Sequence, residues 1–292
     1  MISIIICNRA TEVDKNLLIN IKEHIGDVVY EVISIDNSKN GYDIFQAYNI
    51  GVRKAQYPII CFMHDDILFH SYNWGINVIN HFKDDQLGML GVGGPRFLSS
   101  IPSIWWASNA HNKYFPSACQ YSIDTERNTK VSIHQKIQPI DKNRIEVVAL
   151  DGLFFCIRKS LFKTISFDEI TYHGFHFYDL DISMQVRSVG FKIGVIYDVL
   201  LEHISAGQLN SEWLRSARLF YRKWKEQLPI FTYELTAKER RCLEYSNLKI
   251  MSGILSSNHI SMISYFTCKE MLYLLKWCPK GFIKVVKSWA TS

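Results

Sequence analysis

The sequence predicts an α/β fold in which a mostly parallel sheet is flanked by helices and followed by a C-terminal helical extension. Residues 2–63 alternate short apolar runs with segments of helical periodicity. This β-α-β-α-β order implies parallel strands joined by right-handed crossovers. The run at Ile59–Met63 is continuously apolar, as expected for a strand buried on both faces. Residues 211–292 carry Lys- and Arg-rich helical segments with little strand signal.

Each element of the N-terminal part follows from its own pattern. Strands are predicted at Ile2–Cys7, Val28–Ile35 and Ile59–Met63. Helices are predicted between them at Thr11–His24 and Ile44–Ala55, where apolar residues recur every three or four positions. Each of the three strands ends in polar or acidic residues. Since ligands of open α/β sheets bind at the carboxyl ends of the strands, these residues should line one crevice.

Further along the chain the same alternation continues around a long irregular segment. Helices are predicted at Trp74–Phe82 and Asp179–Val189, and strands at Leu87–Val92, Leu153–Ile157 and Lys192–Tyr197. Another apolar run, Ile145–Leu150, ends at Asp151-Gly152. Residues 96–145 read as an inserted loop, either a substrate-binding lid or a variable surface insertion. We predict two domains, 1–210 and 211–292.

Composition narrows the class of protein. The 292 residues are 48% apolar and 21% charged, which is ordinary for a globular protein. The net charge of +5 is too modest to argue for nucleic acid, but it suits an anionic small molecule or membrane surface. The seven cysteines are scattered without C-x-x-C spacing, which favours reduced thiols. With no signal-peptide pattern and no long apolar run, we expect a cytoplasmic protein.

The C-terminal stretch Met271–Trp289 interleaves apolar residues with lysines. This pattern is typical of an interfacial helix on the inner face of a membrane. It fits equally well a terminal helix that packs on the domain and exposes a basic face. Both interpretations remain open at this point.

The triplet His64-Asp65-Asp66 directly follows the strand at Ile59–Met63. Two carboxylates and an imidazole at one strand end repel one another unless a cation joins them. A divalent metal that also holds phosphate would explain the triplet. The alternative is a helix start with Asp65 or Asp66 as the N-cap residue.

The motifs, in their order and spacing, resemble the GT-A glycosyltransferases, specifically the inverting family 2 type, over roughly residues 2–207. The matching segments are Ser3–Arg9, Ile35–Ser38, Ala47–Gly51, Phe62–Asp66, Leu150–Gly152, Phe177–Asp181 and His203–Gly207. The sequence departs from the family pattern at two positions. His64 replaces the first acid of the DxD motif, and Tyr178 stands where many members have Glu.

The resemblance implies a nucleotide-sugar donor, a divalent metal (Mn²⁺ or Mg²⁺) and a set of site residues. The implied metal ligands are Asp66, His203 and His64. Asp179 is implied as the catalytic base, with Asp181 close by as an alternative, and Asp36 as the ligand of the nucleotide base, usually uracil. The full set implied for donor binding is Cys7, Asn8, Arg9, Asp36, Asn49, Arg53, Asp65, Asp151 and Gly152.

The predicted function is inverting transfer from a nucleotide-diphospho sugar, with UDP as the expected nucleotide, to a hydroxyl of a glycan or lipid-linked acceptor. Two alternatives are a catalytically decayed sugar-nucleotide-binding protein and a nucleotidyltransferase. The latter predicts a Gly-rich basic loop after the first strand, which Cys7–Thr11 lacks. A dinucleotide-dependent dehydrogenase is disfavoured because no G-x-G-x-x-G follows that strand. No nucleic-acid partner is expected.

Overall fold

The structure is a computed structural model that describes residues 1–109, 118–119, 143–203 and 208–267, together with 270–272, 275 and 283. The chain divides into two compact units. The first comprises Met1–Gly94 and Ala118–Gly207, and the second comprises Pro95–Ser117 and Gln208–Ser292. The domain division at residue 210 stays a prediction. In the structure the second unit also includes a segment from well before that boundary.

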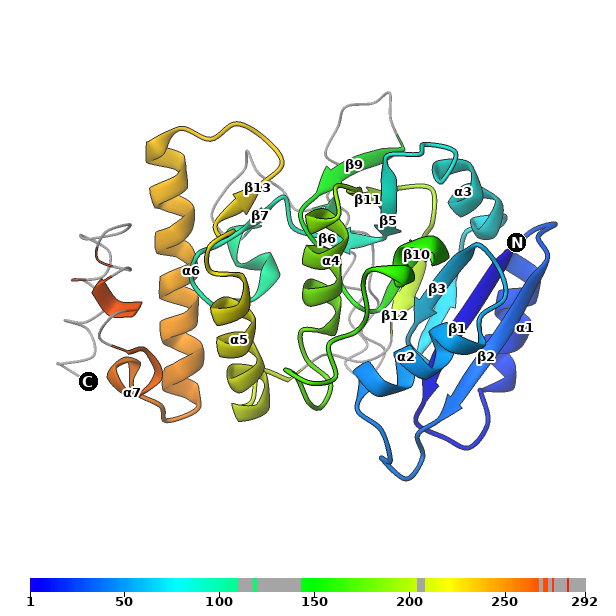
Figure 1. Cartoon of the computed structure of the whole chain (residues 1–292), viewed down its shortest axis with the longest axis horizontal. Helices are drawn as coiled ribbons and strands as arrows, with labels where there is room; N and C mark the ends of the chain where they lie inside the picture. The colour runs from blue at the N-terminus through cyan, green and yellow to red at the C-terminus, as the bar shows by residue number, and fades with distance from the viewer. Residues whose placement is uncertain are drawn as a thin grey trace. The chain divides into compact units, whose positions relative to one another are not determined.

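The first unit is built on a seven-stranded sheet with strand order β2-β1-β3-β10-β5-β11-β9 (Figure 1). Its strands are β1 (Ile2–Asn8), β2 (Tyr30–Asp36), β3 (Ile59–Met63), β5 (Leu87–Gly91), β9 (Arg144–Val147), β10 (Phe154–Arg158) and β11 (Lys192–Ile196). Strands β10 and β9 run antiparallel to their neighbours, whereas the other five share one direction. The prediction of a mostly parallel sheet flanked by helices is therefore confirmed.

Four α-helices lie in the part of this unit that the structure describes. They are α1 (Lys15–His24), α2 (Ile44–Lys54), α3 (Trp74–His81) and α4 (Tyr178–Ser188). Helix α1 begins four residues later than predicted because Asp14 acts as its N-cap and accepts a hydrogen bond from the backbone N–H of Asn16. Helix α2 begins with a capping box formed by Asp43 and Gln46.

The apolar run at 145–150 behaves differently from the prediction. Strand β9 ends at Val147, so Asp151 does not close a parallel strand. It precedes β10, whose first residue Phe154 pairs with Met63 at the end of β3. Because β10 is antiparallel, its start and the end of β3 lie at the same edge of the sheet. Asp151 and Gly152 therefore reach this edge by a different route from the one expected.

A second, two-stranded sheet was not predicted. Strand β4 (Ile67–Phe69) pairs antiparallel with β12 (Leu201–His203), and His203 lies opposite Ile67. The side chain of Asn20 on α1 binds both backbone groups of Phe69, at 2.7 and 3.0 Å. Strand β4, which directly follows the His64-Asp65-Asp66 triplet, is thereby held by β12 on one side and by Asn20 on the other.

The core fills both faces of the main sheet. One face packs alternate residues of β1 and β3 against α1 and α3, with Trp74 fully buried. The other face carries an aromatic cluster in which the rings of Tyr48, Phe62, Phe155 and Phe167 contact one another. Strand residues buried on both faces explain why the sequence shows continuous apolar runs.

The second unit contains the predicted helical extension, with α5 (Ser211–Trp224), α6 (Ala237–Ser257) and α7 (Met262–Tyr265). Its two-stranded sheet joins β7 (Phe97–Leu98) to β13 (Ile230–Phe231). The buried carboxylate of Glu244 on α6 accepts hydrogen bonds from Ser99 Oγ at 2.5 Å and from the N–H and Oγ of Ser100 at 3.0 and 2.8 Å. Three bonds to one carboxylate tie α6 to the chain that follows β7.

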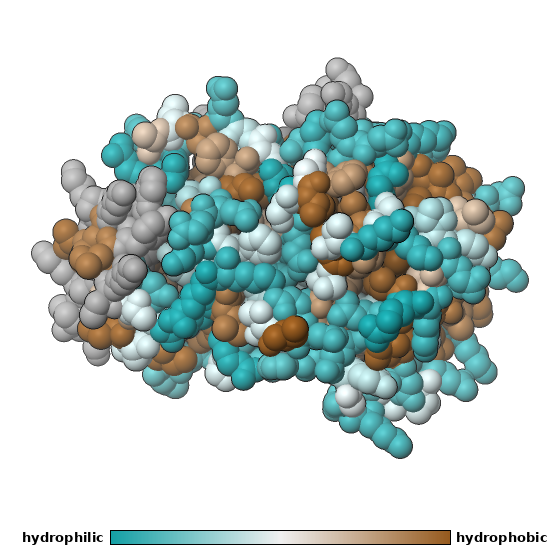
Figure 2. Space-filling model, in the orientation of Figure 1, coloured by the Kyte–Doolittle hydropathy of each residue, from teal (hydrophilic) through white to brown (hydrophobic). Residues whose placement is uncertain are grey.

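Two sequence-based hypotheses fall largely outside the described residues. Most of the 96–145 loop and most of Met271–Trp289 lie there, so the lid and the interfacial helix stay predictions. Within the described part of the chain, no helix is both long and apolar enough to cross a membrane. The face drawn in Figure 2 intersperses hydrophilic and hydrophobic residues.

Candidate functional site

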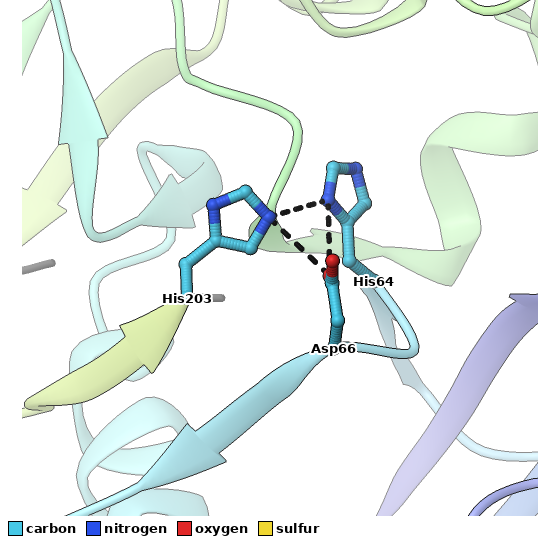
Figure 3. Close-up of side chains that lie close together, drawn as sticks. All are labelled: His64, Asp66 and His203. Carbon is cyan, nitrogen blue, oxygen red and sulfur yellow. Dashed lines mark hydrogen bonds and ion pairs between the residues drawn. The ribbon is translucent and has the colours of Figure 1, made fainter. Parts of the chain in front are cut away.

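The ends of two strand pairs bring His64, Asp66 and His203 together (Figure 3). The N–H of His64 donates to the carbonyl of Leu153 at 3.0 Å, which extends the β3–β10 pairing by one residue. Asp66 immediately precedes β4, and His203 ends the partner strand β12. The three side chains therefore come from three segments that the two sheets hold in register.

Their donor atoms are spaced as a metal site requires. His64 Nδ1 lies 3.2 Å from His203 Nε2, and Asp66 Oδ1 lies 3.3 Å from His203 Nε2 and 3.9 Å from His64 Nδ1. Ligands bonded to one cation at about 2.1 Å stand roughly 3 Å apart when adjacent. Two imidazoles and one carboxylate therefore fit a divalent cation after a small contraction, and this donor set suits transition metals better than Mg²⁺.

Arg9 neutralises the other carboxylate of the triplet. Its backbone N–H and its Nε each donate to Asp65 at 2.9 Å, and its guanidinium also contacts Asp66 Oδ2 at 3.1 Å. Asp65 is thus engaged on both oxygens, while Asp66 keeps Oδ1 toward the histidines. The helix-start alternative is not seen, because Ile67 begins a strand.

His64 is neutral at physiological pH. Partial burial lowers its pKa to about 4, with a further contribution from His203. A neutral imidazole offers one lone pair, which a metal ligand must supply.

Tyr178 and Asp179 open helix α4 beside this group. Tyr178 is buried, and its Oη lies 2.8 Å from His64 Nε2. The pKa of Asp179 is raised to about 7, first by burial and then by the nearby charge of Asp151. Hydrogen bonds from the backbone N–H groups of Leu180 and Gly152 oppose this rise. A carboxylate with a pKa near 7 is suited to accept a proton at neutral pH.

Asp181 and Gly152 lie beside Tyr178 and Asp179, and the structure gives each a structural role. Asp181 is buried and accepts hydrogen bonds from Tyr172 Oη at 3.2 Å and Gln185 Nε2 at 2.8 Å, which gives its carboxylate a structural task. Gly152 leaves room for Tyr178, since a Cβ at position 152 would overlap the tyrosine hydroxyl.

The residues expected around the nucleotide base lie at the ends of β1 and β2. Asn8 pairs with Asp36 across these strands. Asp36 is exposed, and the N–H of Ser38 donates to its carboxylate at 2.9 Å and lowers its pKa. Asn8 is buried and donates to the carbonyl of Ala10 at 2.7 Å. Burial raises the pKa of Cys7 to about 11, so its thiol stays neutral.

The structure does not bring Asn49 and Arg53 to this group. Asn49 uses its amide on the backbone of Phe167, at 2.8 and 3.1 Å, and on Glu169 at 3.0 Å. Arg53 lies in the last turn of α2, which leads into the start of β3. In a β-α-β unit this end of the helix lies at the opposite edge of the sheet from the strand ends.

Sequence analysis missed two contacts of His64. The bond to Tyr178 joins residues 114 positions apart, and the only sequence signal was the replacement of Glu by Tyr at that position. Phe175 carried no signal. Its half-exposed ring has its centroid 5.4 Å from that of His64 and 5.7 Å from that of Tyr178.

Comparisons with known proteins agree with the fold. A family model described as "Glycosyltransferase like family" matches residues 3–232. The streptomycin biosynthesis protein StrF of Streptomyces griseus is 25% identical over 162 residues, which are 54% of this chain and 51% of StrF. The chain thus spans about half the length of that curated relative.

The solved structures that are similar to this chain include TarS and GalNAc-T7. The S. aureus TarS fragment 1–349 in complex with UDP is 12% identical with a TM-score of 0.50, over 98% of this chain and 80% of that one. GalNAc-T7 with UDP, GalNAc and Mn²⁺ is 15% identical with a TM-score of 0.48, over 87% of this chain and 57% of that one. The likeness to TarS shows the fold.

Proposed function

The chain belongs to the glycosyltransferase-like family, and we propose that it transfers a sugar, with inversion, from a nucleotide-diphospho sugar to a hydroxyl of a glycan or lipid-linked acceptor. One observation carries this proposal. A group of metal-ligand type and a carboxylate with a pKa near 7 are joined at one sheet edge through the adjacent residues Tyr178 and Asp179.

On the donor side, His64, Asp66 and His203 would hold a divalent cation, with Mn²⁺ favoured over Mg²⁺. Such a cation neutralises the negative charge that develops on a leaving diphosphate. Asp36, exposed at the end of β2, would accept the ring N–H of uracil. UDP is the first nucleotide to test because TarS, which shares the fold, was solved with UDP.

On the acceptor side, Asp179 would take the proton of the attacking hydroxyl. The hydroxyl oxygen forms a bond to the anomeric carbon while the bond to the diphosphate breaks on the opposite face, which inverts the configuration. With a pKa of about 7, a large share of Asp179 is ionised at neutral pH and can still accept a proton. Asp179 is preferred over Asp181 as the base, because the carboxylate of Asp181 already accepts hydrogen bonds from Tyr172 and Gln185.

The test is calorimetric titration of UDP into the protein with and without Mn²⁺. We expect micromolar binding that needs Mn²⁺ and weakens in Asp66→Ala. Absence of UDP binding in both conditions would reject UDP as the nucleotide of the donor.

Turnover separates an enzyme from a binding protein with a decayed site. Asp179→Asn should leave UDP binding intact and lower the transfer rate by about 10² to 10⁴-fold, the usual contribution of a general base. UDP-sugar binding with no turnover in either the wild-type protein or the variant would instead favour the decayed site.

We further propose that the protein acts in the cytoplasm, with its C-terminal segment at the inner membrane face. The lysine-studded pattern of Met271–Trp289 supports this proposal. A lipid-linked acceptor would then be presented at the same surface.

A further inference from the structure

We propose that Tyr178 is a positioning residue of the cation site. Its hydroxyl oxygen accepts a hydrogen bond from Nε2–H of His64, which leaves Nδ1 of His64 unprotonated and directed at the cation. The inference rests on the proposed function, since it supposes that His64, Asp66 and His203 bind a cation. It adds a residue of α4 to a site otherwise built from the segments around β3, β4 and β12.

The two ring nitrogens of His64 face different partners. Nε2 lies 2.8 Å from Tyr178 Oη, whereas Nδ1 lies 3.2 Å from His203 Nε2 and 3.9 Å from Asp66 Oδ1. A neutral imidazole carries a single proton on one nitrogen or the other. Only the form with the proton on Nε2 can offer the Nδ1 lone pair to a cation, and an acceptor at Nε2 favours that form.

The tyrosine hydroxyl is held in place by packing. Tyr178 is buried, and its ring meets those of Phe45 and Tyr48 edge to face, with centroids 6.3 and 5.5 Å apart. The space that its hydroxyl occupies exists because residue 152 has no Cβ. Because the hydroxyl of Tyr178 cannot move away, His64 keeps this hydrogen bond only in the tautomer that carries its proton on Nε2.

The need for such a device follows from the residue at position 64. A carboxylate offers equivalent oxygens and has no tautomers, whereas a histidine binds metal in only one of its two neutral forms. Outer partners of metal-binding histidines typically change metal affinity by about 10 to 100-fold when they are removed. We therefore expect Tyr178→Phe to weaken cation binding by that factor.

The experiment is a titration with Mn²⁺, with and without saturating UDP, followed by the paramagnetic resonance signal of free aqueous Mn²⁺. The dissociation constant of Tyr178→Phe should rise by about 10 to 100-fold. Tyr172→Phe is the matched control, because it removes another buried tyrosine hydroxyl, one that donates to Asp181. Its Mn²⁺ affinity should equal that of the wild type.

A double-mutant cycle tests the tautomer argument itself. In His64→Asp, position 64 has no tautomers, so adding Tyr178→Phe should leave Mn²⁺ affinity nearly unchanged. An equal penalty in both backgrounds would overturn the inference and assign Tyr178 a general packing role. Equal Mn²⁺ affinity of the wild type and Tyr178→Phe would overturn it as well. No Mn²⁺ binding by the wild type would reject the proposed metal site, and the inference with it.

Discussion

At the scale of single residues, the site depends on how neighbouring carboxylates share charge. Arg9 engages both oxygens of Asp65 and one of Asp66, which allows two adjacent acids at one strand end. Asp151 has the opposite effect on Asp179, because its negative charge helps raise the pKa of that carboxyl to about 7. The first pair of acids thus forms ion pairs with Arg9, whereas in the second pair the raised pKa suits Asp179 to accept a proton at neutral pH.

Asp151→Asn should shift the pH dependence of transfer. For a base with a pKa of about 7, kcat/KM rises roughly tenfold between pH 6 and pH 8 as the base ionises. Removing the charge of Asp151 lowers the pKa of Asp179, so the rise should move to lower pH. Asparagine keeps an oxygen for the N–H of Leu153, which preserves the local turn. The measurement is kcat/KM from pH 5 to 9, and an unchanged profile would show that Asp151 does not act on the base.

Single residues also show where sequence reasoning ends. The acids at strand ends could be recognised from the sequence because each directly follows an apolar run. The bond from His64 to Tyr178 could not, because it depends on how α4 packs against the strand ends. Asn49 and Arg53 were placed by motif alone. In the structure Asn49 bonds to the backbone of Phe167 and Arg53 lies in the last turn of α2, and their part in donor binding stays a prediction.

At the scale of elements, long patterns were predicted and short ones were not. Strand β3 is a continuous apolar run, and β1 is an apolar run interrupted by Ser3, so both could be predicted. Strands β4 and β12 have three residues each, too few for any periodicity, and they exist because each pairs with the other. The antiparallel direction of β10 could not be predicted either, because the sequence of a strand does not determine which strands it pairs with.

Helix α1 supports the site through Asn20. Its amide binds the N–H and the carbonyl of Phe69, as a neighbouring strand would. Strand β4 directly follows Asp66 and pairs with the strand that ends in His203. Asn20→Ala should lower the free energy of unfolding by about 1–3 kcal/mol, since a buried donor and acceptor lose their partner. Mn²⁺ affinity should fall as well, because Asp66 directly precedes β4 and His203 is the last residue of β12.

Urea denaturation and Mn²⁺ titration measure the two effects of Asn20→Ala. Asn77→Ala is the comparison variant, since Asn77 donates from α3 to the carbonyl of Asp198, before β12 begins. It should lower stability without a matching loss of Mn²⁺ affinity. A loss of metal affinity confined to Asn77→Ala would contradict the support assigned to Asn20.

In the second unit, Glu244 fixes helix α6. Its buried carboxylate receives three hydrogen bonds from Ser99 and Ser100, and burial raises its pKa. Glu244→Ala should destabilise the protein by about 2–4 kcal/mol, because the serine donors are left unsatisfied. Glu234→Ala, at an exposed position just before α6, is the control and should change stability little. A thermal unfolding midpoint that is the same for both variants would contradict this account of α6.

At the scale of the whole molecule, the fold class was predictable and the assembly of the second unit was not. The β-α-β order follows from the period of the apolar residues, which is a local property. The joining of residues 95–117 to the C-terminal helices depends on pairing of β7 with β13 and on Glu244, over more than 130 positions of sequence. Such pairing leaves no trace in local periodicity.

Membrane contact by the C-terminal segment can be tested by reversing its lysines, provided that the effect is separated from that of the net charge of +5. One variant reverses four lysines of that segment to glutamate: Lys276, Lys280, Lys284 and Lys287. Each lysine near an anionic surface contributes about 1 kcal/mol of attraction, so binding to anionic vesicles should be lost. Neutral phosphatidylcholine vesicles serve as the blank in a co-sedimentation assay.

The control for net charge reverses four exposed lysines of the first unit: Lys15, Lys22, Lys39 and Lys54. Both variants carry the same total charge, so an effect of overall charge would weaken vesicle binding equally in the two. Contact through the C-terminal segment instead requires that only the C-terminal variant lose binding, because attraction to the surface falls off within a Debye length. Undiminished binding by the C-terminal variant would place any membrane contact elsewhere, and a lipid-linked acceptor would then have to reach the site without help from this segment.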